Sequence, residues 1–75
     1  MNKEILIEIV QTKMPFGKYK GVTIADIPVH YLEWFQSKGF PQGKLGVLLA
    51  TTLEIKSNGL EEIIYNLKKL YGNKD

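Results

Sequence analysis

Apolar positions recur with helical spacing through the second half of the chain. Over residues 60–71 they trace one face, formed by Leu60, Ile63, Ile64, Leu67, Leu70 and Tyr71. Two acidic residues begin this stretch and two lysines end it, the order of charges that stabilises a helix dipole. The stretch 44–57 carries a similar stripe, formed by Leu45, Leu48, Leu49, Thr52 and Ile55, and Asn58-Gly59 follows it as a stop signal. We therefore expect helices over 60–71 and 44–57.

A third helix is expected over residues 28–38, where apolar side chains occupy most of the helix circumference. Asp26 is placed to cap its start, and Pro28 is tolerated in a first helical turn. Gly39 follows as a stop in the left-handed region. This helix is expected to be the central element of the core.

Aromatic residues gather in and after this helix. One interpretation makes Tyr31, Trp34 and Phe35 an exposed platform for a ligand. Aromatic residues at helical spacing bury large apolar areas, however, and more often belong to a core. We therefore assign Trp34 and Phe35 to the core and expect the Tyr31 hydroxyl at the surface. Phe40, in the loop that follows, is expected to pack back onto the core.

The N-terminal stretch 3–12 carries two patterns at once. Its three isoleucines alternate as in a strand, and their β-branched side chains favour strands. The intervening Leu6 and Val10 complete a helical spacing, and Asn2 is placed to cap a helix. We expect a short helix here.

Residues 14–27 are expected to form a β-hairpin. Gly17 and Gly21 bracket an alternation of lysine and aromatic residues, and the short run Val22-Thr23-Ile24 follows. Gly21 suits the turn, whereas glycine at position 17 is typical of a bulge or a close backbone approach. An isolated hairpin is only marginally stable, so it must pack on the helices. The expected fold class is α+β: a small β-hairpin packed against three to four α-helices in a single compact domain, residues 1–75.

The composition limits the class of protein. Seventy-five residues correspond to one domain, and the absence of cysteine excludes disulfides and thiolate metal sites. No apolar run approaches the ~18 residues of a membrane span, and the start shows no secretory pattern. We expect a cytoplasmic protein that makes no membrane contact.

The net charge is +2, and all ten basic residues are lysine. The absence of arginine disfavours bidentate contacts to bases and leaves point-charge contacts to phosphate.

The sequence contains no recognisable catalytic or metal-binding constellation. His30 is the only histidine, whereas a metal site needs several N, S or O ligands. The adjacent Glu61 and Glu62 do not face each other on a helix. The stretch 39–44 resembles a phosphate-binding loop, but its spacing is short and Leu45 stands where Ser or Thr belongs. We expect no enzyme activity, cofactor, metal or small-molecule substrate, and a partly exposed His30.

The candidate binding residues lie in the expected hairpin: Phe16, Gly17, Lys18, Tyr19, Lys20 and Gly21. Lysines there would neutralise phosphates while an exposed ring stacks on a base, worth roughly 1–3 kcal/mol per base. The alternative is a solvated hairpin whose lysines block edge pairing. Lys13 and Lys44 extend the patch if the fold brings them near. We expect a single-stranded or duplex nucleic acid as partner. The rival is a protein, docked by strand addition on the hairpin edge or on the Phe40-Pro41 loop.

Several motifs occur in a fixed order, namely Met14-Pro-Phe-Gly-Lys-Tyr-Lys-Gly21, Asp26-Ile-Pro28, Tyr31-Leu-x-Trp-Phe35, Lys38-Gly-Phe-Pro-x-Gly-x-Leu-Gly46 and Glu54-Ile-Lys-x-Asn-Gly-Leu60. Together, over about residues 5–67, they resemble a small bacterial domain family of unknown function described as "putative quorum-sensing-regulated virulence factor". That description implies a regulatory context, not a reaction.

Residues 14–35 are also similar to the small C-terminal domain of exonuclease X-like DNA exonucleases. This second resemblance implies contact with nucleic acid. The chain lacks the exonuclease domain, so we expect contact without cleavage.

Overall fold

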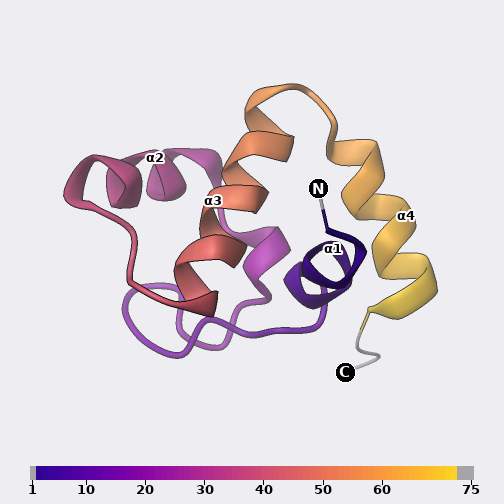
Figure 1. Ribbon diagram of the computed structural model, residues 1–75, viewed down its shortest axis with the longest axis horizontal. Coiled ribbons are helices and arrows are strands. Elements are labelled where there is room, and N and C mark those ends of the chain that lie inside the picture. Colours follow the sequence, from indigo (N-terminus) through magenta and orange to yellow (C-terminus); the bar gives the residue numbers. More distant parts are fainter. Residues whose placement is uncertain (1, 73–75) are drawn as a thin grey trace.

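The computed structural model describes residues 2–72 and is built from helices around a central α3 (Figure 1). Along the chain the elements are α1 (Lys3–Ile9), the short 3-10 helix η1 (Ile24–Asp26), α2 (Val29–Lys38), α3 (Lys44–Ser57) and α4 (Glu61–Tyr71). The bounds of α3 are those expected from its stripe. Expected helices at 28–38 and 60–71 each begin one residue later, and α1 ends at residue 9, not 12. In the part of the chain that the structure describes, no helix is both long and apolar enough to cross a bilayer.

The expected β-hairpin over residues 14–27 does not form, and the α+β fold class was wrong: between residues 2 and 72 the structure has helices and no strand. The only trace of pairing there is one isolated antiparallel bridge between Lys13 and Thr23. The physical reason is that two successive turns occupy the middle of the segment. The amide of Lys20 donates to Gly17 O (3.1 Å) and that of Val22 donates to Tyr19 O (2.9 Å), so these groups cannot pair across a ladder.

What forms instead is a closed loop, residues 13–23, which we call the 13–23 loop. Its ends are held by backbone hydrogen bonds from Met14 N to Val22 O (2.8 Å), from Gly21 N to Met14 O (2.8 Å) and from Ile24 N to Thr12 O (2.9 Å). The Met14 side chain is buried, as is that of Ile24. The loop is therefore attached at its base by two core residues, while its tip is exposed.

The two expected helix caps had different outcomes. Asn2 caps α1 as expected, since its Oδ1 accepts a hydrogen bond of 2.7 Å from the Glu4 amide. The expectation that Asp26 caps α2 was wrong. Asp26 lies in η1, where its carboxylate accepts a hydrogen bond of 2.6 Å from Lys68 Nζ of α4. Pro28 occupies the N-cap position of α2, which has no side-chain cap.

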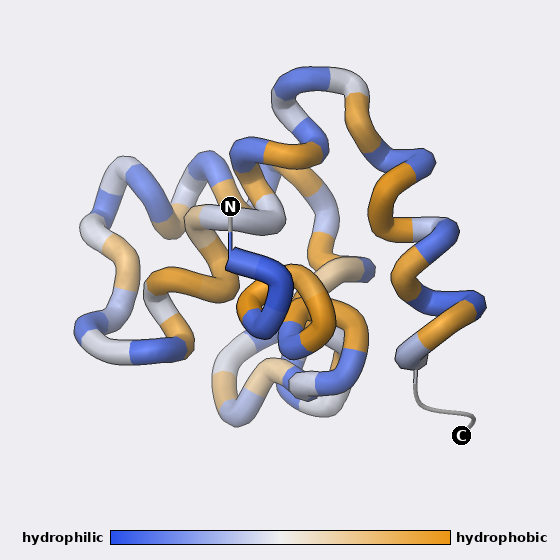
Figure 2. The backbone as a smooth tube through the Cα atoms, turned by 45° about the vertical axis from the view of Figure 1, so that its right-hand side comes forward, coloured by the Kyte–Doolittle hydropathy of each residue, from blue (hydrophilic) through white to orange (hydrophobic). Residues whose placement is uncertain are grey.

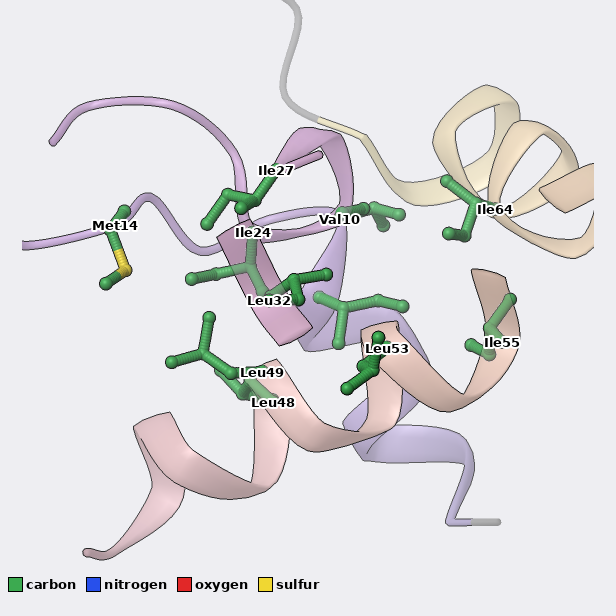
Figure 3. Packing of buried hydrophobic residues seen from close by; sticks show 12 residues of the cluster. Val10, Met14, Ile24, Ile27, Leu32, Leu48, Leu49, Leu53, Ile55 and Ile64 are labelled. Atoms are coloured by element: carbon green, nitrogen blue, oxygen red, sulfur yellow. The ribbon is translucent and has the colours of Figure 1, made fainter. Parts of the chain in front are cut away.

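α3 forms the centre of the core, because α1, α2, η1 and α4 all contact it. The buried apolar side chains come from every element and are Ile9, Val10, Met14, Ile24, Ala25, Ile27, Leu32, Leu48, Leu49, Leu53, Ile55 and Ile64. Met14 lies at one edge of this cluster and Ile64, from α4, at the other (Figure 3). α2, which we expected to be the central element, buries only Leu32 completely. The molecule thus has the 13–23 loop and α2 on one side of α3, and α4 on the other (Figure 1).

Polar contacts tie these elements together at the surface. Lys44 of α3 forms an ion pair of 3.0 Å with Glu8 of α1, an exposed contact worth at most about 1 kcal/mol. Lys56 Nζ donates a hydrogen bond of 2.7 Å to Ile27 O. Burial lowers the pKa of Lys56 from its ordinary value, and the nearby Asp26 carboxylate acts in the opposite direction. Lys56 is thus a structural tether between α3 and the residues that precede α2.

Candidate functional site

The candidate binding residues, at positions 16–21, all lie within the 13–23 loop. Lys18 and Lys20 are exposed, and the Phe16 side chain, which precedes Gly17, is 46% exposed. Tyr19 is half-buried and points back toward α2, where its ring meets the Tyr31 ring edge-on at 4.7 Å between centroids. The two lysines are therefore exposed as expected, whereas the Tyr19 ring between them packs against α2, and all three lie in a loop and not in a hairpin.

An aromatic row continues from the loop across α2. The Tyr31 ring stacks on Trp34 at 5.6 Å and meets Phe35 edge-on at 5.9 Å. Phe35 in turn stacks on Phe40 at 6.1 Å. Tyr31, Phe35 and Phe40 are half-buried against the core, so Phe40 packs back as expected. Tyr19 and Trp34 in turn pack on this half-buried group, since both contact Tyr31 and Trp34 also meets Phe35.

The assignment of Trp34 to the core was wrong, since its side chain is 51% exposed. Helical spacing correctly grouped Trp34 with Tyr31 and Phe35, but Leu32 is the one residue of α2 that is fully buried, so the core covers only part of this helix. Tyr31 covers one face of the indole and leaves much of the rest open to solvent. Trp34 therefore presents an exposed ring at the surface of α2, whereas Tyr31 and Phe35 pack against the core.

Lysines border these rings. Lys18 Nζ lies 5.7 Å from the centroid of the Tyr19 ring, within the range of a cation–π contact. Lys38 is exposed one turn beyond Trp34, and residues four apart share a helix face. Lys44 does not extend the patch, because it pairs with Glu8. We use the name loop–α2 surface for Lys18, Tyr19 and Lys20 of the loop with Tyr31, Trp34 and Lys38 of α2.

The side of α2 that faces α3 carries negative charge. A hollow of about 420 Å³ lies between parts of α2 and α3 and is lined by Glu33, Gln36, Ala50, Leu53, Glu54, Ser57 and Asn58. Its two charged side chains are carboxylates, which repel phosphate. His30 is exposed near the start of α2. Across residues 2–72, no three His, Cys, Asp or Glu side chains gather as ligands for a metal ion. The charged side chains of the loop–α2 surface are therefore positive, and those of the hollow are negative.

Gly17 fixes how the loop meets the aromatic row. Its φ is +81°, and a Cβ added there would lie 3.1 Å from the Tyr31 hydroxyl oxygen. We expect Gly17→Ala to destabilise the fold by about 1–2 kcal/mol, because a residue with a Cβ is strained in the left-handed backbone region. The added Cβ should also displace the Tyr31 side chain. Thermal unfolding measures the first effect and near-ultraviolet circular dichroism the second.

Gly21→Ala is the matched control for that substitution. Gly21 has a similar φ of +87°, but a Cβ at this position meets no atom within 4 Å. Both variants should lose similar stability from the backbone, and only Gly17→Ala should change the aromatic circular dichroism. An equal aromatic signal in the two variants would contradict the contact between Gly17 and Tyr31.

Comparison with known proteins places the chain among uncharacterised relatives. A family model described as "Putative quorum-sensing-regulated virulence factor" matches residues 2–67. "Uncharacterized protein YpeB" of Escherichia coli strain K12 is 54% identical over 70 residues, which cover 92% of this chain and 97% of that protein. The protein of the same name from Escherichia coli O157:H7 matches with the same identity and coverage. No solved structure matches the chain.

Proposed function

Because this chain belongs to the family described as "Putative quorum-sensing-regulated virulence factor", whose description names no reaction, we propose a function from the loop–α2 surface: a non-catalytic nucleic-acid-binding module. The observation that carries the proposal is the half-exposed Trp34 ring, stacked on Tyr31 next to a loop that presents Lys18 and Lys20. Rings held at a surface among lysines are the combination that single-strand binding proteins use.

The geometry favours a single strand over a duplex. A ring can stack on a base only if that base has left its own stack, and bases in a duplex remain stacked. Lysine offers a point charge to phosphate, and the chain has no arginine for bidentate contacts to base edges. The module should therefore bind single strands with little sequence preference, through stacking on Trp34 and phosphate contacts at Lys18 and Lys20.

Trp34 is the only tryptophan of the chain, so tryptophan fluorescence, excited at a wavelength where tyrosine does not absorb, reports on the proposed site alone. We expect a short single-stranded oligonucleotide to quench this fluorescence, because a base stacks on the indole. The logarithm of the association constant should fall with the logarithm of salt concentration with a slope of about −1.4, if Lys18 and Lys20 each neutralise one phosphate of a single strand. A fluorescence titration at several salt concentrations measures both quantities.

Two further ligands make the titration decisive. An abasic oligonucleotide of equal length retains the phosphates but offers no base, so it should bind more weakly and leave the fluorescence unquenched. A duplex of the same sequence should also bind more weakly than the single strand. Equal quenching by the abasic strand, or no response to any strand at low salt, would contradict the proposal.

A protein partner is the alternative occupant of the same surface. Strand addition on a hairpin edge, one form of this alternative, loses its template because no strand forms between residues 2 and 72. The Phe40-Pro41 loop is also less available, since the Phe40 ring packs on Phe35. An apolar protein contact at Trp34 would respond little to salt, so the same salt titration separates the two kinds of partner.

A further inference from the structure

The apolar face of α4 is only partly covered by the rest of the protein. Ile64 is buried, and Leu67 and Tyr71 are half-buried against the core. Ile63 is 39% exposed and Leu70 is 73% exposed. Apolar and polar residues alternate along this helix, as Figure 2 shows. α4 thus has an apolar flank that neither α1 nor α3 covers.

Two residues of opposite charge, one near each end of α4, lie beside this flank. Ile63 and Leu70 are seven residues apart, so they point in nearly the same direction from the helix axis. Glu62 and Lys69 are also seven residues apart and form a parallel line beside them. Lys69 Nζ lies 5.1 Å from the centroid of the exposed Tyr65 ring, while the other lysine of this turn, Lys68, pairs with Asp26. One end of the line is therefore acidic and the other basic.

We propose that a second copy of this chain binds along this flank, with its α4 antiparallel. A two-fold axis near the middle of the helix would place Ile63 against the partner's Leu70 and Glu62 against the partner's Lys69. Both apolar side chains would leave water, both charge pairs would have opposite signs, and the two helix dipoles would be antiparallel. A parallel arrangement, with the two-fold axis along the helices, would instead place the two Glu62–Lys69 lines on opposite sides of the contact, where they cannot pair with each other. The charge order therefore selects an antiparallel homodimer.

The first test measures self-association of the full chain by sedimentation equilibrium. We expect a monomer–dimer equilibrium, and Leu70→Glu should raise the dimer dissociation constant at least about tenfold, because it places a carboxylate in the apolar contact. Val47→Glu is the matched control: Val47 is 49% exposed on α3, and the substitution makes the same change of charge. Since both side chains are exposed, both variants should retain the thermal unfolding of the parent.

The second test uses the charge order. Glu62→Lys alone and Lys69→Glu alone each place like charges together and should weaken the homodimer. A 1:1 mixture of the two variants should associate more tightly than either variant alone, since in the mixed dimer both pairs again have opposite signs. A change in helix stability cannot produce this rescue. A monomer at all concentrations, a dimer that survives Leu70→Glu, or a mixture without rescue would each overturn the proposal.

Discussion

Gly46→Ala should destabilise the protein by about 3 kcal/mol, although the same change in an exposed helix interior stabilises by about 1 kcal/mol. Gly46 is buried in the first turn of α3. A Cβ at this position would overlap the carbonyl oxygen of Pro41 and lie 3.6 Å from the Phe40 Cβ. The obstacle is backbone and not the end of a flexible side chain, so α3 and the 39–43 segment would have to move apart.

Urea unfolding followed by circular dichroism measures this change, since the denaturation midpoint reports the free energy of unfolding. Ala50→Gly is the control, because Ala50 is an exposed position of the same helix and should lose only about 1 kcal/mol. Alanine should therefore be favoured at position 50 and disfavoured at position 46. A Gly46→Ala variant as stable as the parent would show that the 39–43 segment does not press on α3.

The double substitution Lys18→Glu with Lys20→Glu should abolish binding of the single-stranded oligonucleotide. Each substitution subtracts two charges, so the net charge changes from +2 to −2, and the new carboxylates repel phosphate at the proposed site. Both lysines are exposed, so the thermal unfolding should change little. The main cost is the contact of Lys18 with the Tyr19 ring, worth about 0.5–1 kcal/mol at an exposed site. Quenching of Trp34 fluorescence provides the measurement.

The control for charge alone compares two single substitutions. Lys20→Glu and Lys3→Glu alter the net charge equally, but Lys3 lies at the start of α1 and outside the loop–α2 surface. We expect Lys20→Glu to weaken binding and to reduce the salt slope, and Lys3→Glu to do neither. Equal effects of the two substitutions would mean that binding responds only to overall charge. A double variant that still quenches would place the site elsewhere.

The helices could be predicted where the features that form and end them are local in the sequence. α3 and α4 have regular stripes with charges or stop signals at their ends, and Asn2 needs only its neighbour's amide to cap α1. The 13–23 loop was not predictable from its alternating pattern, because a hairpin and two successive turns satisfy the same residues. The choice depends on which carbonyl each amide reaches, and hydropathy does not contain that information.

The candidate site was predicted in part. The loop residues follow from glycine placement and lysine–aromatic alternation, and the structure leaves Lys18 and Lys20 exposed. Trp34 was missed because spacing shows which residues share a helix face, not how much of that face a neighbour covers. α2 buries only Leu32 completely, and the extent of its contact with α3 is a property of the whole fold. A useful signal was present in Lys38, since a lysine one turn beyond a tryptophan indicates a solvent-facing flank.

Two kinds of residue alternate closely between positions 14 and 24: buried residues that anchor the 13–23 loop and exposed residues that project from it. Met14 and Ile24 hold the loop in the core, while Phe16, Lys18 and Lys20 project from it and contribute little to stability. Substitutions at the projecting positions should therefore be tolerated in many combinations, because these side chains are exposed and the contact of Lys18 with the Tyr19 ring is worth only about 0.5–1 kcal/mol. A library randomised at these three positions should therefore yield mostly folded variants, which thermal unfolding of individual members would check.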